Sequence, residues 1–178
     1  ANQVLLQLVY LTSYTMDGVA VAAETLVGQA FGARQRARLR RSALLTSGWA
    51  MTICAALSLV FWLCGTSLVA WMTTAEAVRL AADVYLPYLV LVPICSCAAF
   101  MLDGVFIGAT RTGDMRNMMA VSLAIYLVVA LVLMPVWGNA GLWVALLVSF
   151  IARGATLAVR YPALERAGDE VVCAESRP

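Results

Sequence analysis

Long apolar stretches alternate with short polar connectors along the whole chain. Five stretches hold about 20 or more mostly apolar residues, which is the length that a helix needs to cross a bilayer. Backbone polar groups must be paired inside lipid, so these stretches are predicted helices, and the ten-residue alternating strands of a closed barrel are not found. The pattern predicts an all-α integral membrane protein with about five transmembrane helices, spanning about 4–31, 43–71, 84–110, 118–136 and 141–159.

The connectors contain turn-forming and helix-breaking residues. They read FGARQRAR, TTAEAVRLAAD, RTGDMRN and PVWGN. We expect residues 1–167 to form one transmembrane helical lobe, and residues 168–178 (GDEVVCAESRP from Gly168) to form a polar cytoplasmic tail that is disordered. Because the chain begins with Ala in the middle of the pattern, and no signal peptide precedes it, we expect it to be part of a longer protein.

Composition supports the membrane assignment and excludes several kinds of site. The chain is 63% hydrophobic and 12% charged, whereas a soluble domain has roughly 45–50% apolar and about 25% charged residues. The net charge of +2 is too small to indicate nucleic-acid binding. There is no His, and the five cysteines lack a C-x-x-C spacing, so we expect no metal site and no cofactor, with the cysteines as packing residues. The cysteines are Cys54, Cys64, Cys95, Cys97 and Cys173.

The placement of the basic residues, all of which are Arg, predicts the orientation. Cytoplasmic connectors carry an excess of basic residues, so the first and third connectors and the C-terminus are predicted to be cytoplasmic and the first helix to start outside. Five aromatic residues near the opposite ends fit an outer interfacial belt. The arginines are Arg34, Arg36, Arg38, Arg40 and Arg41, then Arg111 and Arg116, then Arg160, Arg166 and Arg177; the belt residues are Trp71, Tyr85, Tyr88, Trp137 and Trp143.

Three carboxylates lie within the apolar stretches. Asp17 and Glu24 are seven residues apart, about two helical turns, so both point to one face about 10 Å apart along the axis. Asp103 lies in the third stretch. Charged side chains inside a bilayer cost roughly 2.5–3.5 kcal/mol on insertion scales and mark ion pathways. These acids are therefore the candidate cation-coupling residues, able to hold a proton or a hard cation such as sodium.

Each acid also has a structural interpretation. Glu24 and Asp103 could reach the inner interface or pair with an Arg, whereas Asp17 at mid-depth has no easy route to water. A glycine follows Asp17 and Asp103, and Pro87 and Pro93 interrupt the third stretch, which is typical of hinges or of tight helix packing. Four side chains near the acids could line an apolar substrate pocket or simply pack: Tyr14, Met16, Met101 and Phe106.

The acid-bearing stretches TMDGVAVAAETLVGQAFGARQRAR and FMLDGVFIGATRTGDMRN resemble the second half of a MATE-type transporter (multidrug and toxic compound extrusion), in its DinF-like branch. GLWVALLVSFIARGATL is similar to the last helix of that family. The resemblance covers nearly all of residues 1–167. The matching residues are Asp17, Gly18, Ala20, Ala22, Glu24, Leu26, Val27, Gly28, Gly32, Ala33, Arg34, Arg36 and Arg38, then Asp103 through Thr112, Met115, Arg116 and Asn117.

The resemblance implies a fold of twelve helices in two lobes that rock to export cationic or amphipathic compounds against proton or sodium influx. The five helices here would be the eighth to the twelfth, so this is a partial C-terminal six-helix lobe, and the N-terminal lobe is a missing partner. Asp103 would correspond to the acid of the tenth helix, which is implicated in cation coupling. Asp17 and Glu24 would lie on the eighth helix and face the interior of the lobe. The expected partners are membrane lipid and a small organic cation or amphipathic substrate, in a bacterial inner membrane.

Three other interpretations remain open. A lipid-linked oligosaccharide flippase shares the larger superfamily's fold, but it would favour several basic residues inside the lobe, and only Arg153 approaches a span interior. An intramembrane protease is disfavoured because RTGD lacks the first glycine of a G-x-G-D motif and no G-x-S-G is present, so we expect no enzyme. A non-transporting membrane assembly subunit is the third alternative.

Overall fold

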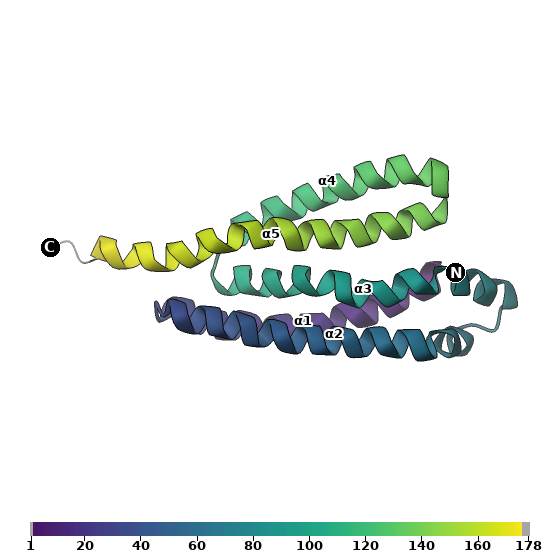
Figure 1. Ribbon diagram of the computed structural model, residues 1–178, viewed down its shortest axis with the longest axis horizontal. Coiled ribbons are helices and arrows are strands. Elements are labelled where there is room, and N and C mark those ends of the chain that lie inside the picture. The colour runs from purple at the N-terminus through teal and green to yellow at the C-terminus, as the bar shows by residue number, and fades with distance from the viewer. Residues whose placement is uncertain (1, 176–178) are drawn as a thin grey trace.

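A computed structural model describes the backbone of residues 2–175 and the side chains of residues 2–166. Within this part the chain forms five antiparallel α-helices laid side by side (Figure 1). Each is long and apolar enough to cross a membrane, which confirms the predicted all-α fold. The helices are α1 (Asn2–Gly32), α2 (Arg36–Met72), α3 (Glu76–Gly108), α4 (Thr112–Trp137) and α5 (Asn139–Glu175).

The helices extend further than the apolar stretches predict. Helix α2 already begins at Arg36, so the cluster of arginines forms its first turns instead of a loop, because Arg, Ala and Leu are all good helix formers. Helix α5 continues to Glu175, whereas the sequence predicts a disordered tail from Gly168. Helix-favouring Ala, Glu and Arg residues around Gly168 account for the difference. Residues 176–178 of the predicted tail lie outside the described residues.

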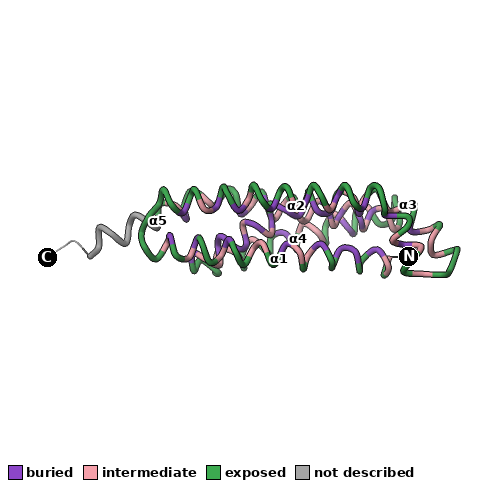
Figure 2. The backbone as a smooth tube through the Cα atoms, turned by 90° about the horizontal axis from the view of Figure 1, so that it is seen from below, coloured by how far each residue is buried: buried purple, intermediate pink, exposed green. Residues whose placement is uncertain are grey.

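Helix α3 is the centre of the bundle. It packs against α1, α2 and α5, whereas α4 packs mainly against α5. Figure 2 shows the consequence, with buried positions along the facing sides of the helices and exposed positions on their outer sides. Helix α4 has only two buried residues in its length, Ser122 and Ala130.

The core has three apolar clusters that follow one another along the bundle. Leu5, Phe61 and Leu89 belong to the cluster near the N-terminus of α1, and Phe106 and Leu157 belong to the cluster at the opposite end. The middle cluster contains two of the five cysteines, and the predicted packing role is confirmed for these two. Its members are Met16, Ala23, Ala50, Cys54, Cys97 and Met101. Cys64 is exposed, and the side chain of Cys173 lies outside the described residues.

Helix α3 passes through Pro87 and Pro93 without a break, so the predicted interruption of this span is wrong. Proline removes one backbone hydrogen bond, and neighbouring helices can compensate inside a membrane protein. The Ser58 hydroxyl of α2 donates to the backbone carbonyl of Val90, next to the carbonyl of Leu89 that Pro93 leaves without its helical donor. This hydrogen bond joins α2 to α3 one residue from the carbonyl that lacks its helical donor.

Two glycines bring α3 unusually close to α1. A Cβ atom added to Gly104 would lie 2.5 Å from the carbonyl oxygen of Ala20, and one added to Gly108 would lie 2.5 Å from that of Glu24. These positions are four residues apart and share one face of α3. Small residues with this spacing are common where transmembrane helices pack closely. Gly104 is therefore a packing residue, not a hinge. The same contact places the two acid-bearing helices against each other.

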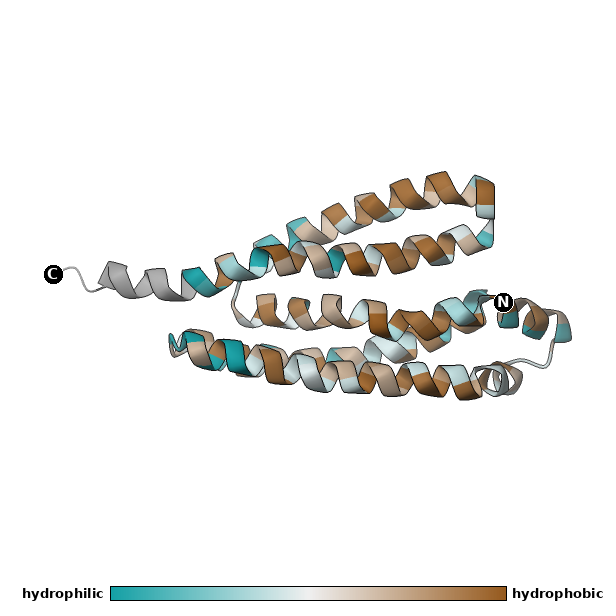
Figure 3. Ribbon diagram, in the orientation of Figure 1, coloured by the Kyte–Doolittle hydropathy of each residue, from teal (hydrophilic) through white to brown (hydrophobic). Residues whose placement is uncertain are grey.

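The two ends of the bundle differ in charge. Figure 3 shows hydrophilic residues at both ends of the bundle, and the arginines of the first and third connections lie at the end that contains the α1–α2 and α3–α4 connections. At this end Arg36 of α2 pairs with Glu165 of α5 at 3.2 Å. At the opposite end Arg79 donates to the backbone carbonyls of Thr73 (2.8 Å) and Ala70 (2.6 Å), which caps the C-terminal end of α2.

The aromatic residues of that opposite end divide into two groups. Trp71 and Trp137 are exposed, as an interfacial belt requires. Trp143 is buried, so its predicted place in the belt is wrong. Its indole donates to the side-chain oxygen of Asn2 at 3.4 Å, and Asn2 and Asn139 exchange amide hydrogen bonds of 2.5 and 2.8 Å. Trp143 therefore belongs to the contact between α1 and α5.

Candidate functional site

The central feature of the bundle is an ion pair between α3 and α5. The Nη2 atom of Arg153 lies 2.5 Å from Oδ2 of Asp103, and its Nε donates to Oδ1 at 3.3 Å. Asp103 is buried, with 7% of its surface exposed, and the Arg153 side chain is half-buried. A two-pronged contact of this kind is the strongest that a guanidinium makes with a carboxylate. Both oxygens of Asp103 are thereby engaged.

A close helix contact sets the position of the ion pair. Gly154 follows Arg153, and a Cβ atom there would lie 3.1 Å from that of Ala98 on α3. The absence of a side chain lets α5 approach α3 one residue from the guanidinium. The sequence identifies Arg153 as a charged residue in an apolar stretch. It does not predict the pairing with Asp103, which is 50 residues away in the chain. An Arg within an apolar stretch indicates such a pairing, because a charged side chain inside a membrane needs a partner of opposite charge.

Asp17 is the second acid of the site. It lies on α1, three residues before Ala20, whose backbone oxygen meets Gly104 next to Asp103, so the two acids are on helices in direct contact. Asp17 is exposed, and in the part of the chain that the structure describes it forms no ion pair. With Asp103 and Arg153 it makes a group of two negative charges and one positive charge. When all three are ionised, the group has a net charge of −1.

Glu24 lies about two turns further along α1, toward the arginine-rich end. Its side chain is half-buried, and no ion pair to it is found among the described residues. The structure therefore pairs Asp103 with Arg153, and it leaves Asp17 and Glu24 on the neighbouring helix α1 without an ion pair among the described residues.

The four predicted pocket residues differ in burial within the part of the chain that the structure describes, and their role in a substrate cavity stays a prediction. Met16 and Met101 are buried in the middle cluster and Phe106 in the cluster at the arginine-rich end, whereas Tyr14 is 73% exposed. Because α1 and α3 touch closely at the glycines, Met16 and Met101 pack in the interface between these helices.

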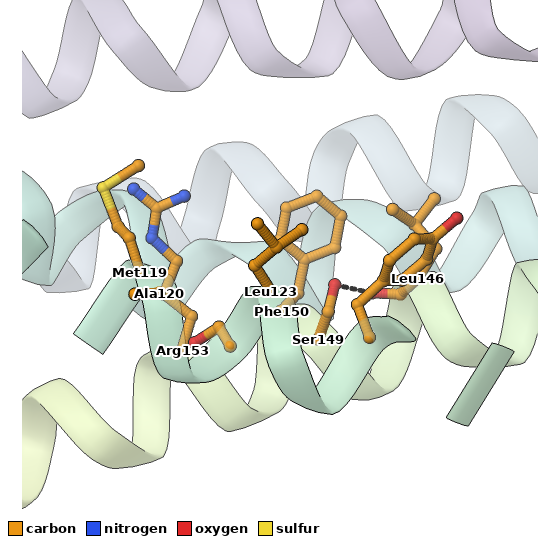
Figure 4. Close-up of a pocket in the computed structure, with 9 residues that line it drawn as sticks. Met119, Ala120, Leu123, Leu146, Ser149, Phe150 and Arg153 are labelled. Carbon is orange, nitrogen blue, oxygen red and sulfur yellow. Dashed lines mark hydrogen bonds between the residues drawn. The ribbon is translucent and has the colours of Figure 1, made fainter. Parts of the chain in front are cut away.

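A cavity of about 440 Å³ lies between α4 and α5 (Figure 4). Its walls are mostly apolar, and Arg153 stands at one end beside Met119 and Ala120. The guanidinium thus faces both the buried Asp103 and this cavity. Sequence reasoning did not identify the cavity, although Ser122, Ser149 and Arg153 are polar positions in apolar stretches. The lining residues are Met119, Ala120, Ser122, Leu123, Tyr126, Leu146, Ser149, Phe150 and Arg153.

A smaller cavity of about 170 Å³ continues toward the start of α1 and shares Tyr126 and Leu146 with the first. Among the residues that the structure describes, no group of three His, Cys, Asp or Glu side chains is placed to hold a metal ion. The chemistry of the site is therefore that of charge pairing beside an apolar cavity.

Five membrane-length helices around a buried ion pair define a multi-pass helical membrane protein. The MatE family model matches residues 1–136, and the chain belongs to that family. It is similar to DNA damage-inducible protein F of Escherichia coli (strain K12), with 40% identity over 160 residues, 88% of this chain. The chain spans about a third of the length of that curated relative, since the matched part is 34% of it. No solved structure matches the chain.

Proposed function

We propose that the chain is part of a cation-coupled secondary antiporter of the MATE type, which exports organic cations or amphipathic compounds by alternating access. Membership of the MatE family supports the transporter class. The observation that carries the proposal is the buried ion pair of Asp103 and Arg153 within membrane-length helices, with a further acid, Asp17, on the adjoining helix α1. Ionised side chains inside a membrane are costly, and they are typical of ion and substrate pathways.

The charge balance of this group suits exchange of one positive charge. Its net charge of −1 is neutralised by one proton, one sodium ion or one organic cation. In the apolar interior, binding of one such charge is favourable and binding of a second is not. Competition between the coupling ion and a cationic substrate for one negative charge is the behaviour that an antiporter requires. Intramembrane acids are thus the binding groups, and no cofactor other than the coupling ion is invoked.

The cavity between α4 and α5 supports an amphipathic substrate. Its apolar walls, with Phe150 and Leu123 among them, can take up an apolar body, while Ser149 and Tyr126 supply polar atoms. Ligand pockets commonly combine apolar walls with a few polar groups in this way. A cavity of about 440 Å³ is within the usual range for a small molecule.

We also propose a multi-pass location in the bacterial inner membrane, with the arginine-rich end in the cytoplasm. The N-terminus of the chain would then be outside and its C-terminus cytoplasmic. Support comes from Arg34, Arg36, Arg111 and Arg116 at one end of the bundle, and from exposed Trp71 at the other. A cysteine scan with a membrane-impermeant thiol reagent in spheroplasts tests this: Trp71→Cys should be labelled and Arg116→Cys protected.

The alternatives receive less support. The single interior base, Arg153, is already paired with Asp103, which disfavours the flippase reading because an anionic lipid-linked sugar needs available positive charge. Asp114 pairs with Arg111 at 3.6 Å in the first turn of α4, at the end of the bundle, which does not resemble a protease centre. The flippase and the assembly subunit are the alternative outcomes of the test below.

The test uses the complete reading frame in proteoliposomes. Efflux of a fluorescent organic cation is followed under an imposed proton or sodium gradient, for wild type and for Asp17→Asn, Glu24→Gln and Asp103→Asn. Gradient-driven efflux that one of the substitutions abolishes, in a protein that still folds, supports the antiporter. No transport by wild type under either gradient, or equal transport by all three variants, contradicts it and favours the flippase or the assembly subunit.

A further inference from the structure

We infer that the first turns of α2 bind an anionic phospholipid with two phosphate groups, of the cardiolipin type. The site is an exposed surface of α2, which we call the arginine–leucine surface. It is separate from the buried ion pair and from the cavity between α4 and α5, and it does not depend on the proposed transport. Its members are Arg38, Arg40, Arg41, Leu44 and Leu45.

The first turns of α2 hold more positive charge than the described part of the chain neutralises. The segment RARLRR, which begins α2, contains four arginines and no acid. Arg36 pairs with Glu165 of α5. The other three are exposed and form no ion pair among residues 2–166, whose side chains the structure describes: Arg38, Arg40 and Arg41. The positive end of the helix dipole lies at the same place and favours anions over further cations. A bound anion therefore relieves the repulsion among these charges.

Helix geometry arranges the surface in two parallel rows. Residues three or four apart lie above one another on an α-helix. Arg40 is thus followed by Leu44 in one row, and Arg38 and Arg41 are followed by Leu45 in the other. Both leucines are exposed, at 65% and 57% of their surface. Each row has a guanidinium nearer the end of the bundle and an apolar side chain nearer its middle, which is the order of phosphate and acyl chain in a phospholipid.

Two adjoining hollows lie along these rows. One of about 740 Å³ is lined by Arg40 and Leu44, and one of about 590 Å³ is lined by Arg38. Arg41 and Leu45 line both hollows. A lipid with one phosphate would use the guanidinium groups of one hollow. Two phosphates joined by a short glycerol linker can use both, with Arg41 between them.

The apolar part of the site continues along α2. A further hollow of about 250 Å³ begins at Leu44 and Leu45 and reaches Gly48 and Trp49. Nothing lies within 4 Å of a Cβ atom added to Gly48, and the Trp49 side chain is exposed. An acyl chain can therefore extend from the two leucines over Gly48 and contact the indole ring.

The length of α2 places the surface at the level of the lipid headgroups. Its 37 residues span about 55 Å, longer than the hydrocarbon core of about 30 Å and the roughly 40–45 Å that include the headgroups. Arg41 is the last charged residue of α2, and Leu44 and Leu45 follow within one turn. The boundary between headgroups and acyl chains thus coincides with the change from arginine to leucine. A soluble phosphate would match the arginines but would leave the leucines without a partner, so the arrangement favours a lipid.

The test is native mass spectrometry of the full-length protein, purified in detergent and titrated with tetraoleoyl cardiolipin, dioleoyl phosphatidylglycerol or dioleoyl phosphatidylcholine. We expect affinity to fall in that order. An arginine near the membrane surface contributes roughly fivefold in affinity for an anionic lipid. Arg38→Gln/Arg41→Gln should therefore lower the affinity for cardiolipin by about tenfold or more. Arg116→Gln/Arg160→Gln is the matched control, because it removes two exposed arginines of α4 and α5 that line none of the three hollows, and it should remain within about twofold of wild type.

Two further measurements test the lipid assignment. Leu44→Ser/Leu45→Ser keeps every charge and should weaken cardiolipin binding by about threefold or more, which decides the question if the arginine variant does not fold. Glycerol 1,3-bisphosphate, which has two phosphates and no acyl chains, should not displace the lipid at equal concentration.

Four results would overturn the inference. They are equal binding of phosphatidylglycerol and cardiolipin, cardiolipin affinity in the folded arginine or leucine variant within about twofold of wild type, a loss in the control as large as in the arginine variant, and displacement of the lipid by the soluble bisphosphate. Each measurement reports binding alone, so these outcomes are independent of whether the protein is an antiporter.

Discussion

Arg153 of α5 holds both carboxylate oxygens of Asp103 of α3, at 2.5 and 3.3 Å. This contact joins two helices that are separated by a whole further helix in the chain, and it compensates a buried negative charge in an apolar bundle. Without it the interior would contain an isolated carboxylate. Its stability can be tested separately from any transport activity.

Removing either member of the pair should destabilise the protein more than removing both. A buried charge without its partner typically costs about 3–5 kcal/mol, whereas replacing both partners by neutral groups is often close to neutral. Thermal unfolding of the detergent-solubilised full-length protein should show lower melting temperatures for Asp103→Asn and Arg153→Gln. The double variant should recover most of the loss. Equal, additive losses would show that the two side chains do not stabilise each other.

A methyl group at Gly104 should separate α1 from α3. Its Cβ would lie 2.5 Å from the backbone oxygen of Ala20, and that oxygen can move only with α1. We expect Gly104→Ala to lower the melting temperature and to weaken a crosslink between cysteines placed on α1 and α3. Gly18→Ala is the matched control, because nothing lies within 4 Å of its added Cβ and Ala is favoured over Gly in a helix by about 1 kcal/mol. A harmless Gly104→Ala would contradict the close approach of these helices.

The paired amides of Asn2 and Asn139 should fix the start of α5 against α1. They exchange hydrogen bonds of 2.5 and 2.8 Å, and Asn2 also accepts one from Trp143. Asn139→Ala leaves the Asn2 side-chain N–H without its acceptor and the Asn2 oxygen with Trp143 alone, at a cost of about 1–3 kcal/mol. Hydrogen exchange of the first turns of α5 should increase. Asn117→Ala, at an exposed position in α4, should leave exchange unchanged, and a similar effect at both sites would show that the amide pair has no special role.

Filling the cavity between α4 and α5 should discriminate between large and small transported compounds. Both Leu123 and Leu127 are exposed, but Leu123 lines this cavity and Leu127 lies outside its walls. Leu123→Trp should reduce efflux of a bulky amphipathic dye more than efflux of a small organic cation. Leu127→Trp, about one turn further along α4, should affect neither. If the two variants transport both compounds equally, the cavity is not on the substrate route.

The number and order of the helices could be predicted from hydropathy, since an apolar stretch of about 20 residues has few other stable forms. The candidate site was harder. Asp17 and Asp103 were identifiable as ionisable groups in apolar stretches, but the pairing of Asp103 with Arg153 depends on how α5 packs on α3. Burial of Met16, Met101 and Trp143 likewise depends on helix rotation, which uniformly apolar spans do not encode in their periodicity. Tertiary contacts between distant segments decide these features.

Main-chain atoms alone set the spacing between α1 and α3 where Gly104 and Gly108 meet the carbonyl oxygens of Ala20 and Glu24. Side chains elsewhere on these helices can therefore change during evolution without altering the separation of Asp17 from Asp103. Homologous chains that keep both glycines could diversify their cavities for different compounds while retaining one electrostatic arrangement. If either glycine were replaced, side chains would set the spacing between α1 and α3. Substitutions at this contact would then also change the distance between the acids.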